Sequence, residues 1–505
     1  MNQHINNLIA ATTVLVSTLG SAVQANSATE RPNVIFIMTD DQGYPCVGAH
    51  GHPWLETPHM DEMHATSVRF DRFMMGSTCA PSRAGIMTGN HSIRNGVTHT
   101  IYERERVNLD ATTIPEVLKA SGYTSGCFGK WHLGDEAAYQ PENRGFDEVF
   151  IHGAGGIGQA YPGSCADTPK NKYFDPVFKH NGTFVKTKGY CTDVIFDATL
   201  GWIKAKKDEE APFFAYLATN APHGPFIAPP SYQKKFEDIG FSGKTAGFFG
   251  MIEHIDENLG RLFDKLEEWG LTENTIVVFT SDNGMTKTGS GYRGYAGRPQ
   301  VRLTPQHAKK AYFSYNANMK GLKGTVHEGG VRAPFFVHWG SKFQQGKTVN
   351  TVASYLDILP TLADLAGAPL PNTQEFEGRS LTPLLFEENP VWEDRYLFQH
   401  VTRWDHKVNP DDYKWKQFSV RSQKFRLVET ELYDMEKDPN QTVDVSDQYP
   451  ELVADMRKQY EAFWDEVRPL MINENVPLAK ERPFHVDYFA QKKARGIPLW
   501  AAPEL

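Results

Sequence analysis

The chain lacks the features of a nucleic-acid-binding or membrane-spanning protein. Its 505 residues include 61 acidic side chains against 52 Lys and Arg, which gives a formal net charge of -9. Nucleic-acid binding needs a basic face that replaces the counterions on the phosphates, and this balance does not supply one. After the N-terminal segment, no stretch reaches the ~18 consecutive apolar residues that a membrane-spanning helix requires. We therefore expect neither a nucleic acid nor a membrane as a partner.

The N-terminal segment contains no Lys or Arg, yet its pattern is that of a secretory signal peptide. Residues 8–19 are apolar or small, and Val23-Gln24-Ala25 offers a small-residue cleavage site before a polar stretch. This pattern predicts a signal peptide over residues 1–25 and a periplasmic or secreted protein. The alternative interpretation is a disordered tail.

Cysteine is scarce, and its count is odd. With five cysteines in an exported protein, at least one lies outside any disulfide. Cys165 and Cys191 fall in a polar, loop-rich stretch and are the pair that we expect to form a disulfide. Cys127 lies in an apolar run and Cys46 beside a candidate metal site, which leaves Cys79 for another task.

The order of apolar and amphipathic segments predicts an α/β fold with a doubly wound, mainly parallel sheet. Helical segments separate four apolar runs that read as buried strands, and the clearest helix covers residues 251–269. Near residue 390 the pattern changes to short aromatic and charged strands followed by a helix. We expect a main domain over residues 30–390 and a C-terminal subdomain with an antiparallel sheet over 391–505. The four expected strands are Val34–Met38, Thr124–Phe128, Phe213–Leu217 and Ile276–Thr280.

Polar residues follow each of these four strands. In doubly wound sheets, ligands bind beyond the carboxyl ends of the strands. Carboxylate and amide oxygens are the ligands that Ca²⁺ prefers. The sequence therefore predicts a calcium site beside basic groups at one edge of the sheet. The residues concerned are Asp40, Asp41, Lys130, His132, His223, Asp282 and Asn283.

The segment from Cys79 to Gly89, CAPSRAGIMTG, resembles the signature of type I sulfatases, the formylglycine-dependent members of the alkaline phosphatase superfamily. The resemblance covers most of residues 32–340 in the order of that family. It rests further on Asp40-Asp41, Gly129-Lys130-Trp131-His132-Leu133-Gly134, Ala221-Pro222-His223, Thr280-Ser281-Asp282-Asn283-Gly284, and Lys323-Gly324 before Glu328-Gly329-Gly330. The residues Leu432-Tyr433-Asp434 resemble the C-terminal subdomain of the family.

The resemblance implies a specific role for each motif. A formylglycine-generating enzyme would oxidise Cys79, whose hydrated aldehyde would attack sulfur and complete the Ca²⁺ site. Arg83, Lys130 and Lys323 would balance the negative charge of the carboxylates and the sulfate. His132 would act as the base that restores the aldehyde, and His223 with Lys323 would face the leaving oxygen. A pKa near neutrality suits either histidine to either task, so the residues alone leave the two assignments interchangeable.

A basic and aromatic stretch offers a surface for the rest of the substrate. Between Asn283 and Glu328 the chain has eight Lys or Arg residues and no Asp or Glu. Aromatic rings stack on sugars while cations bind further sulfates or carboxylates. The alternative interpretation of this composition is a solvated surface loop. The candidate ligands are Tyr292, Arg293, Arg298 and Tyr315. The expected substrate is a sulfated oligosaccharide from an acidic polysaccharide, with an algal galactan or fucan ahead of a glycosaminoglycan.

Two other functions fit the same fold. A phosphomonoesterase, phosphodiesterase or phosphonate hydrolase would bind a similar tetrahedral anion, although Cys79 within its signature favours sulfate esters. A sulfated-glycan-binding protein without turnover would keep Cys79 as a thiol. The sequence does not give the sugar, the position of its sulfate or the oligomeric state.

Overall fold

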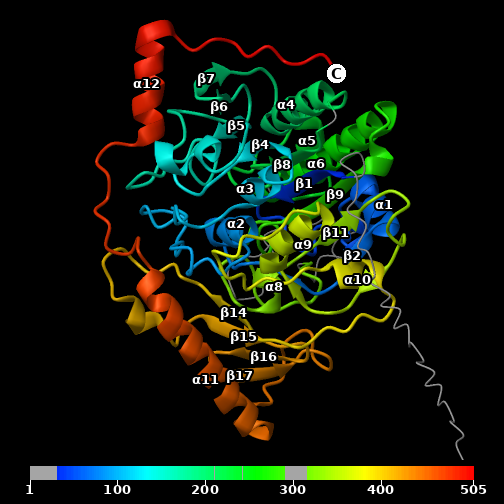
Figure 1. The fold of residues 1–505 in the computed structure, drawn as a ribbon, viewed down its shortest axis with the longest axis vertical. Helices are drawn as coiled ribbons and strands as arrows, with labels where there is room; N and C mark the ends of the chain where they lie inside the picture. The colour runs from blue at the N-terminus through cyan, green and yellow to red at the C-terminus, as the bar shows by residue number, and fades with distance from the viewer. Residues whose placement is uncertain (1–30, 210, 242, 291–314) are drawn as a thin grey trace, which may run out of the picture.

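The computed structural model describes residues 31–209, 211–241, 243–290 and 315–505 (Figure 1). The predicted signal peptide lies outside the described residues, and so do Tyr292, Arg293 and Arg298. Among the residues described, no helix combines the length and the apolar character needed to cross a bilayer.

A ten-stranded sheet forms the centre of the molecule, and the four predicted strands are neighbours within it. They are β9 (Thr275–Ser281), β1 (Asn33–Thr39), β8 (Phe213–Ala218) and β4 (Thr124–Lys130), all parallel and in that order across the sheet. Ile37 of β1 pairs with Leu217 on one side and Phe279 on the other. Strands buried on both faces read as continuous apolar runs, which is why the sequence revealed them.

Shorter strands extend the sheet on both sides. β5 (Glu148–His152) continues it in parallel beside β4, and β6 (Val177–His180) and β7 (Thr183–Lys186) follow in antiparallel pairing. Beyond β9 lie β11 (Phe335–His338), β2 (Val68–Phe70) and β12 (Thr348–Val349). A separate small sheet joins β10 (Arg332–Ala333), β3 (Phe73–Met74) and β13 (Ala353–Ser354). The predicted α/β, mainly parallel architecture is thereby confirmed, with antiparallel strands at its edges.

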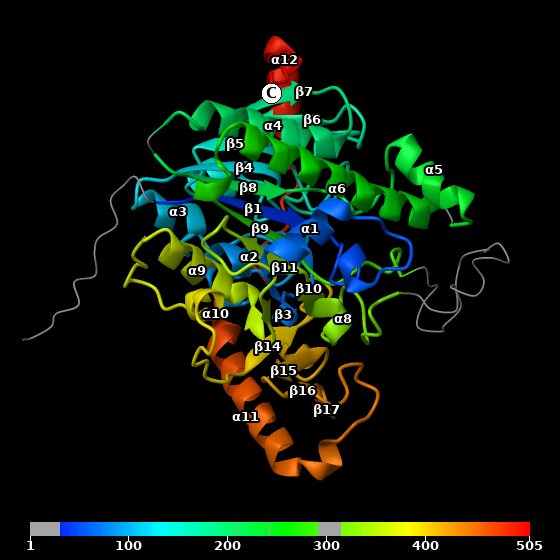
Figure 2. The ribbon, with the colours of Figure 1, turned by 90° about the vertical axis from the view of Figure 1, so that its right-hand side faces the viewer.

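Helices cover both faces of the sheet and create two hydrophobic layers (Figure 2). Val34, Phe36 and Met38 of β1 point to one layer, whereas Ile35 and Ile37 point to the other, as the two-residue period of a strand requires. The first layer contains α2 (Cys79–Thr88), α3 (Ile114–Lys119), α9 (Ile358–Leu365) and α10 (Thr382–Phe386). The second contains α1 (Pro58–Thr66), α4 (Cys191–Lys206), α5 (Pro230–Asp238) and α6 (Gly243–Glu268).

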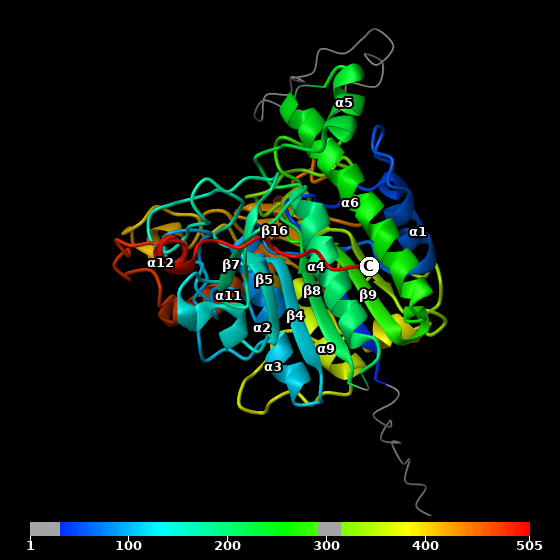
Figure 3. The same cartoon turned by 90° about the horizontal axis from the view of Figure 1, so that it is seen from above.

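Helix α6 begins at Gly243, eight residues before the predicted start at residue 251. Glycine destabilises a helix, and the section that the predicted helix omits contains Gly247 and Gly250. They are needed because α5 packs closely against α6 (Figure 3). A Cβ atom at Gly247 would lie 2.2 Å from the carbonyl oxygen of Phe226, and one at Gly250 would lie 2.9 Å from the backbone of Tyr232. Close packing therefore overrides the local preference.

The C-terminal part forms a second, four-stranded antiparallel sheet with a covering helix. Its strands are β14 (Leu397–His400), β15 (Phe418–Arg421), β16 (Phe425–Val428) and β17 (Glu431–Asp434), and α11 (Pro450–Val467) packs on them. The predicted antiparallel sheet and helix are confirmed. The sequence did not predict α12 (Pro483–Arg495), which packs Phe484 against Phe184 of β7 at the opposite end of the molecule (Figure 1).

A buried ion pair joins this second sheet to the main domain. Arg426 of β16 donates to Glu328, the first residue of α8 (Glu328–Val331), at 2.7 Å. Both side chains are buried, and Arg426 also donates to the carbonyl of Val326. The pair therefore fixes the C-terminal sheet against the segment that follows Lys323.

We expect Glu328→Ala to destabilise the protein by about 3–5 kcal/mol, because it leaves the buried charge of Arg426 without a partner. Urea unfolding followed by circular dichroism would measure the loss. Adding Arg426→Met to the first change should recover part of it, since the second change removes the uncompensated charge. An unaltered unfolding midpoint in Glu328→Ala would contradict this account.

The expected disulfide between Cys165 and Cys191 is wrong. All five cysteines are free thiols, and all are buried. Cys165 lies in a loop with its sulfur 3.8 Å from the carbonyl oxygen of Thr100, whereas Cys191 begins α4 and packs in the second hydrophobic layer. Polar neighbours in the sequence suggested exposed loops, but the structure places the two thiols in different buried surroundings.

Candidate active site

The carboxyl ends of four adjacent strands bring the predicted polar residues together. Asp40 and Asp41 follow β1, and Asp282 and Asn283 follow β9 beside it; we call these four residues the acidic cluster. The backbone amide of Asp41 donates to Asp282 at 3.1 Å, and the Asn283 amide donates to Asp41 at 2.9 Å. Asp40 and Asp282 therefore lie on the same side of one sheet edge, as the strand pattern predicted.

Cys79 is the first residue of α2, and the helix directs its N-terminal end at the acidic cluster. Pro81 fits in this first turn because the missing N–H has no helical partner there. Every residue of α2 is buried. A Cβ atom at Gly85 would lie 2.0 Å from the ring of Tyr355, so glycine is what lets the helix approach that ring. The Cys79 sulfur lies within 4.8 Å of carboxylate oxygens from both Asp40 and Asp282.

Three cations balance the three carboxylates of the acidic cluster. Arg83 donates to Asp282 through two nitrogens, at 2.9 and 3.2 Å, and Lys130 contacts Asp40 at 2.6 Å. Lys323 contacts Asp41 at 2.6 Å. Three negative and three positive groups leave no net charge, so a divalent cation would make the site positive. A positive site suits a substrate that carries an anionic ester.

The donor set fits a hard cation such as Ca²⁺. Asp40 Oδ1 and Asn283 Oδ1 are buried and lack a hydrogen-bond partner among the described residues. A buried oxygen without a partner is costly, and a bound cation removes that cost. The acidic cluster supplies oxygen ligands from three carboxylates and one amide, which is the ligand type that Ca²⁺ takes. These four residues would hold the ion, with Cys79 beside it.

Burial and charge shift the ionisation of these groups in different directions. Burial raises the pKa of Asp40 and of Asp282 to about 6, although Lys130 and Arg83 act in the opposite direction. Burial also raises the pKa of Asp41, but Lys323 and His223 outweigh it, and that pKa lies well below its usual range. Burial likewise raises the pKa of the Cys79 thiol, yet Lys130 and Lys323 reverse the shift and lower it. The surrounding cations thus favour an anionic Cys79.

The two histidines present different nitrogens to the site. Nε2 of His132 donates to the carbonyl of Thr100 at 2.9 Å, so Nδ1 carries no proton in the neutral ring. That Nδ1 is buried and has no hydrogen-bond partner among the described residues, which leaves it able to accept a proton. His223 is held the other way: its Nδ1 donates to Gly224, and its Nε2 lies 3.8 Å from Asp41. The hydrogen bonds therefore distinguish two groups that the sequence left interchangeable.

Two residues of the site have left-handed backbone conformations. Asp41 has a φ of 71° and His132 a φ of 63°, which non-glycine residues rarely adopt. Such conformations cost of order 1–3 kcal/mol and concentrate at functional sites. Gly155 has a related role, because a Cβ atom there would lie 2.5 Å from the His132 ring.

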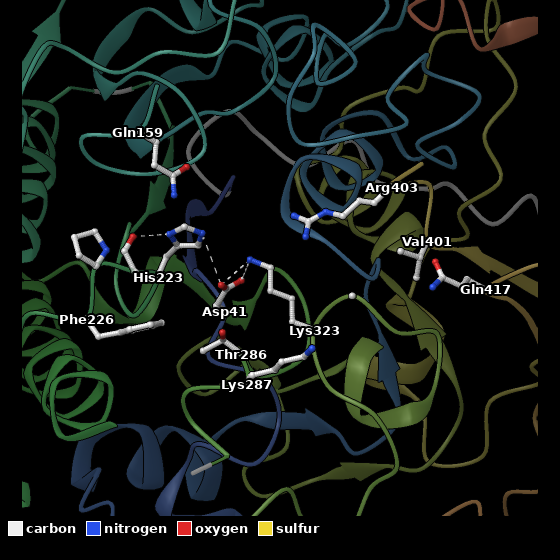
Figure 4. A pocket seen from close by; sticks show the side chains of 13 residues that line it. Asp41, Gln159, His223, Phe226, Thr286, Lys287, Lys323, Val401, Arg403 and Gln417 are labelled. Carbon is white, nitrogen blue, oxygen red and sulfur yellow. Dashed lines mark hydrogen bonds and ion pairs between the residues drawn. The ribbon is translucent and has the colours of Figure 1, made fainter. Parts of the chain in front are cut away.

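The site faces a cavity of about 660 Å³ between the main domain and the C-terminal sheet (Figure 4). Asp41, His223 and Lys323 line its inner part, Phe226 lies on one side and Arg403 on the other. A smaller cavity of about 210 Å³ adjoins it through His223, Gln159 and Arg403, and contains Cys79 and His132. The strand pattern did not predict several other lining residues, which come from loops, among them His99, Gln159, Tyr161, Lys287, Arg403 and Gln417.

Tyr315 lies away from these cavities. Its hydroxyl donates to the carbonyl of His50, and its ring packs edge-on against His52 at a centroid distance of 5.2 Å. Neither cavity includes Tyr315 in its lining, so the expected direct contact with substrate finds no support there. From the same basic stretch, Lys287 and Lys323 do line the larger cavity.

A doubly wound sheet with a buried, charge-balanced cluster at its strand ends is an arrangement that can bind an anionic ester. Comparison with known proteins specifies the class further: the sulfatase family model matches residues 32–368, and the model for the C-terminal part of N-sulphoglucosamine sulphohydrolase matches residues 322–466. The chain belongs to the sulfatase family and is a sulfuric ester hydrolase.

Individual relatives agree with this family. Arylsulfatase A of Homo sapiens is 32% identical over 396 residues, covering 72% of this chain and 70% of that protein. N-acetylgalactosamine-6-sulfatase of Rattus norvegicus is 28% identical over 401 residues, covering 76% and 71%.

Solved structures agree as well. The crystal structure of Ps i-CgsB matches with a TM-score of 0.71 and 26% identity, covering 92% of this chain and 98% of that one; the same protein has been solved with k-i-k-neocarrahexaose. A structure in complex with its substrate D-glucosamine-2-N,6-O-disulfate shares the fold, at a TM-score of 0.67 and 22% identity over 88% of this chain and all of that chain.

Proposed function

We propose that this sulfatase removes sulfate from sulfated oligosaccharides, using a formylglycine made from Cys79 and a bound Ca²⁺. The observation that carries the proposal is the position of Cys79 at the start of α2, beside the acidic cluster and in the small cavity that adjoins a larger one. The proposal includes export to the periplasm or beyond the cell. It also includes maturation by a formylglycine-generating enzyme.

The chain's own residues supply the binding of the sulfate group. A formylglycine at position 79 would contribute the attacking hydroxyl of its hydrate. Arg83 and Lys130 are oriented in advance by Asp282 and Asp40, so they bind developing charge on the sulfate oxygens without reorganising. The first amides of α2 face the same place, where the positive end of the helix dipole favours an anion.

The geometry divides the proton transfers between the histidines. His132 offers Nδ1 as an acceptor beside Cys79, with its ring held by Thr100, which suits it to take a proton from the residue-79 hydroxyl. The side chains of His223 and Lys323 lie beside the carboxylate of Asp41. Both residues line the larger cavity, where the leaving sugar oxygen would be. The ammonium group of Lys323 is suited to donate a proton to that oxygen. His223 would donate one from Nε2 only as the imidazolium, because Nδ1 holds the proton of its neutral ring.

Carbohydrate is the substrate class that the cavity and the relatives support best. Ps i-CgsB has been solved with k-i-k-neocarrahexaose, and one relative is named for a sulfated amino sugar. The cavity offers Phe226 for a sugar face and Gln159 for hydroxyl groups. We place an algal galactan or fucan ahead of a glycosaminoglycan.

Mass spectrometry and a substrate panel together test this proposal. We expect the peptide containing residue 79, from protein made in the native host, to carry formylglycine in place of cysteine. The same preparation should release sulfate from sulfated oligosaccharides faster than from an aryl sulfate, because remote contacts lower the barrier. Protein made without the maturation enzyme should keep the thiol and lack turnover. Efficient hydrolysis of phosphate esters, or turnover with an unmodified Cys79, would refute the proposal.

A further inference from the structure

Two cations that line the catalytic cavity, Arg403 and Lys287, are not paired with the acidic cluster. Arg83, Lys130 and Lys323 each pair with an aspartate of that cluster. Arg403 comes instead from the loop after β14 and lines both cavities. Within residues 31–209, 211–241, 243–290 and 315–505, no carboxylate lies within 4.0 Å of its guanidinium. Lys287 lines only the larger cavity, so Arg403 is the uncommitted cation that also lines the smaller cavity beside Cys79.

The guanidinium of Arg403 is positioned rather than free in solvent. Its Nη2 donates to the hydroxyl of Thr100 at 3.0 Å, which aims the group into the cavity from the side opposite Phe226 (Figure 4). Cys79 is only 2% exposed, whereas Arg403 is exposed. Arg403 thus lies nearer the cavity mouth than Cys79 does. It would lie beside the scissile sulfate and would not bind that group itself.

His99 adds a hydrogen-bond donor to the same part of the site, and its contacts determine which ring nitrogen carries the proton. Its Nδ1 accepts from the backbone amides of Thr100 at 2.8 Å and Ile101 at 3.2 Å. A nitrogen that accepts two hydrogen bonds carries no proton, so the proton of the neutral ring is on Nε2. His99 lines the smaller cavity together with Cys79 and Arg403. An anion there would meet a guanidinium and an N–H, both anchored through Thr100 or its backbone.

We propose that Arg403 and His99 recognise a second anionic group, a sulfate or a carboxylate, that the saccharide carries beside the sulfate to be removed. The inference rests on the proposed function and narrows its substrate class to saccharides with at least two acidic groups close together. The scissile sulfate occupies the inner site at Cys79, and the second group binds nearer the mouth. Arginine suits this task because its fork binds carboxylate and sulfate oxygens through two parallel hydrogen bonds.

Steady-state kinetics of the matured, calcium-loaded full chain test this inference. The substrates are one saccharide with a single sulfate, the same saccharide with a second sulfate, and one with a carboxylate in place of that second sulfate. We expect Arg403→Gln to lower kcat/KM for one or both diacidic substrates by about 10- to 100-fold more than for the monosulfated one. The diacidic substrate that loses more identifies the second group. Arg403→Lys, which keeps the charge but not the fork, should recover part of the discrimination.

Lys437→Gln is the matched control. Lys437 is an exposed cation of the same C-terminal sheet region that lines neither cavity, so its loss should change no substrate preference. Equal losses on all three substrates in Arg403→Gln would mean that Arg403 only supports the Thr100 loop, and would overturn the inference. A wild-type enzyme that releases sulfate but does not favour diacidic saccharides would overturn it too, while leaving the proposed function intact. Failure to release sulfate from any of them would instead contradict the proposed function.

Discussion

Replacing Cys79 with alanine is expected to reduce kcat/KM for sulfate release by at least ~100-fold while the protein still folds. Alanine lacks the thiol through which Cβ would be converted to an aldehyde, so no hydrated aldehyde can form. The change is small for the fold, because Cys79 makes no disulfide and alanine suits a helix. Sulfate release from a sulfated oligosaccharide measures the activity, and the thermal unfolding midpoint measures the fold.

Cys191→Ala provides the control for the loss of a buried thiol. Cys191 lies at the start of α4 in the second hydrophobic layer, away from the acidic cluster. This variant should keep its turnover. Its thermal unfolding midpoint should fall slightly, because a buried sulfur atom is removed. A Cys79→Ala protein with the wild-type kcat/KM would exclude residue 79 as the nucleophile and with it the formylglycine proposal.

Removing divalent cations is expected to lower sulfate release about as much as Cys79→Ala does. Without the ion, the three carboxylates and three cations of the site cancel, and the sulfate must bind beside aspartates with no added positive charge. Treatment with a chelator should therefore lower turnover by about 100-fold or more. Ca²⁺ should restore activity better than Mg²⁺, which demands stricter geometry and keeps its waters.

A measurement independent of activity makes this test sharper. An ion that binds only the folded chain stabilises it by about 2.7 kcal/mol at a hundredfold excess over its Kd. Ca²⁺ should thus raise the unfolding midpoint of the chelated protein. In Asn283→Ala, which lacks one amide ligand, a higher Ca²⁺ concentration should be needed for the same rise. If Ca²⁺ leaves the unfolding midpoint unchanged and the chelated protein keeps full turnover, the proposed metal is ruled out.

The sequence predicted the centre of the site well because parallel strands impose a simple rule. Each buried strand was visible as an apolar run, and the residues that follow such runs meet at one edge. Asp40 and Asp282 are 242 positions apart in the chain, yet β1 and β9 pair directly and bring them together. The order of strands across the sheet was not needed for this conclusion, since all four carboxyl ends share the same edge.

The outer part of the site could not be predicted in the same way. His99, Gln159 and Arg403 lie on loops, whose paths depend on contacts such as the hydrogen bond from Arg403 to Thr100. No periodic pattern marks such residues. The helical start of α6 and the whole of α12 were missed for a related reason: their stability comes from packing on distant segments, not from their own composition.

The burial of α2 sets an order of events during the synthesis of the enzyme. Cys79 is 2% exposed and lies at the end of a helix whose ten residues are all buried. A second enzyme cannot hold this segment in its own active site once the surrounding sheet and helices have closed over it. Under the proposed maturation, oxidation of Cys79 would therefore compete in time with folding, and a chain that folded first would keep an inactive thiol. The yield of active enzyme would then depend on how long the nascent chain stays unfolded.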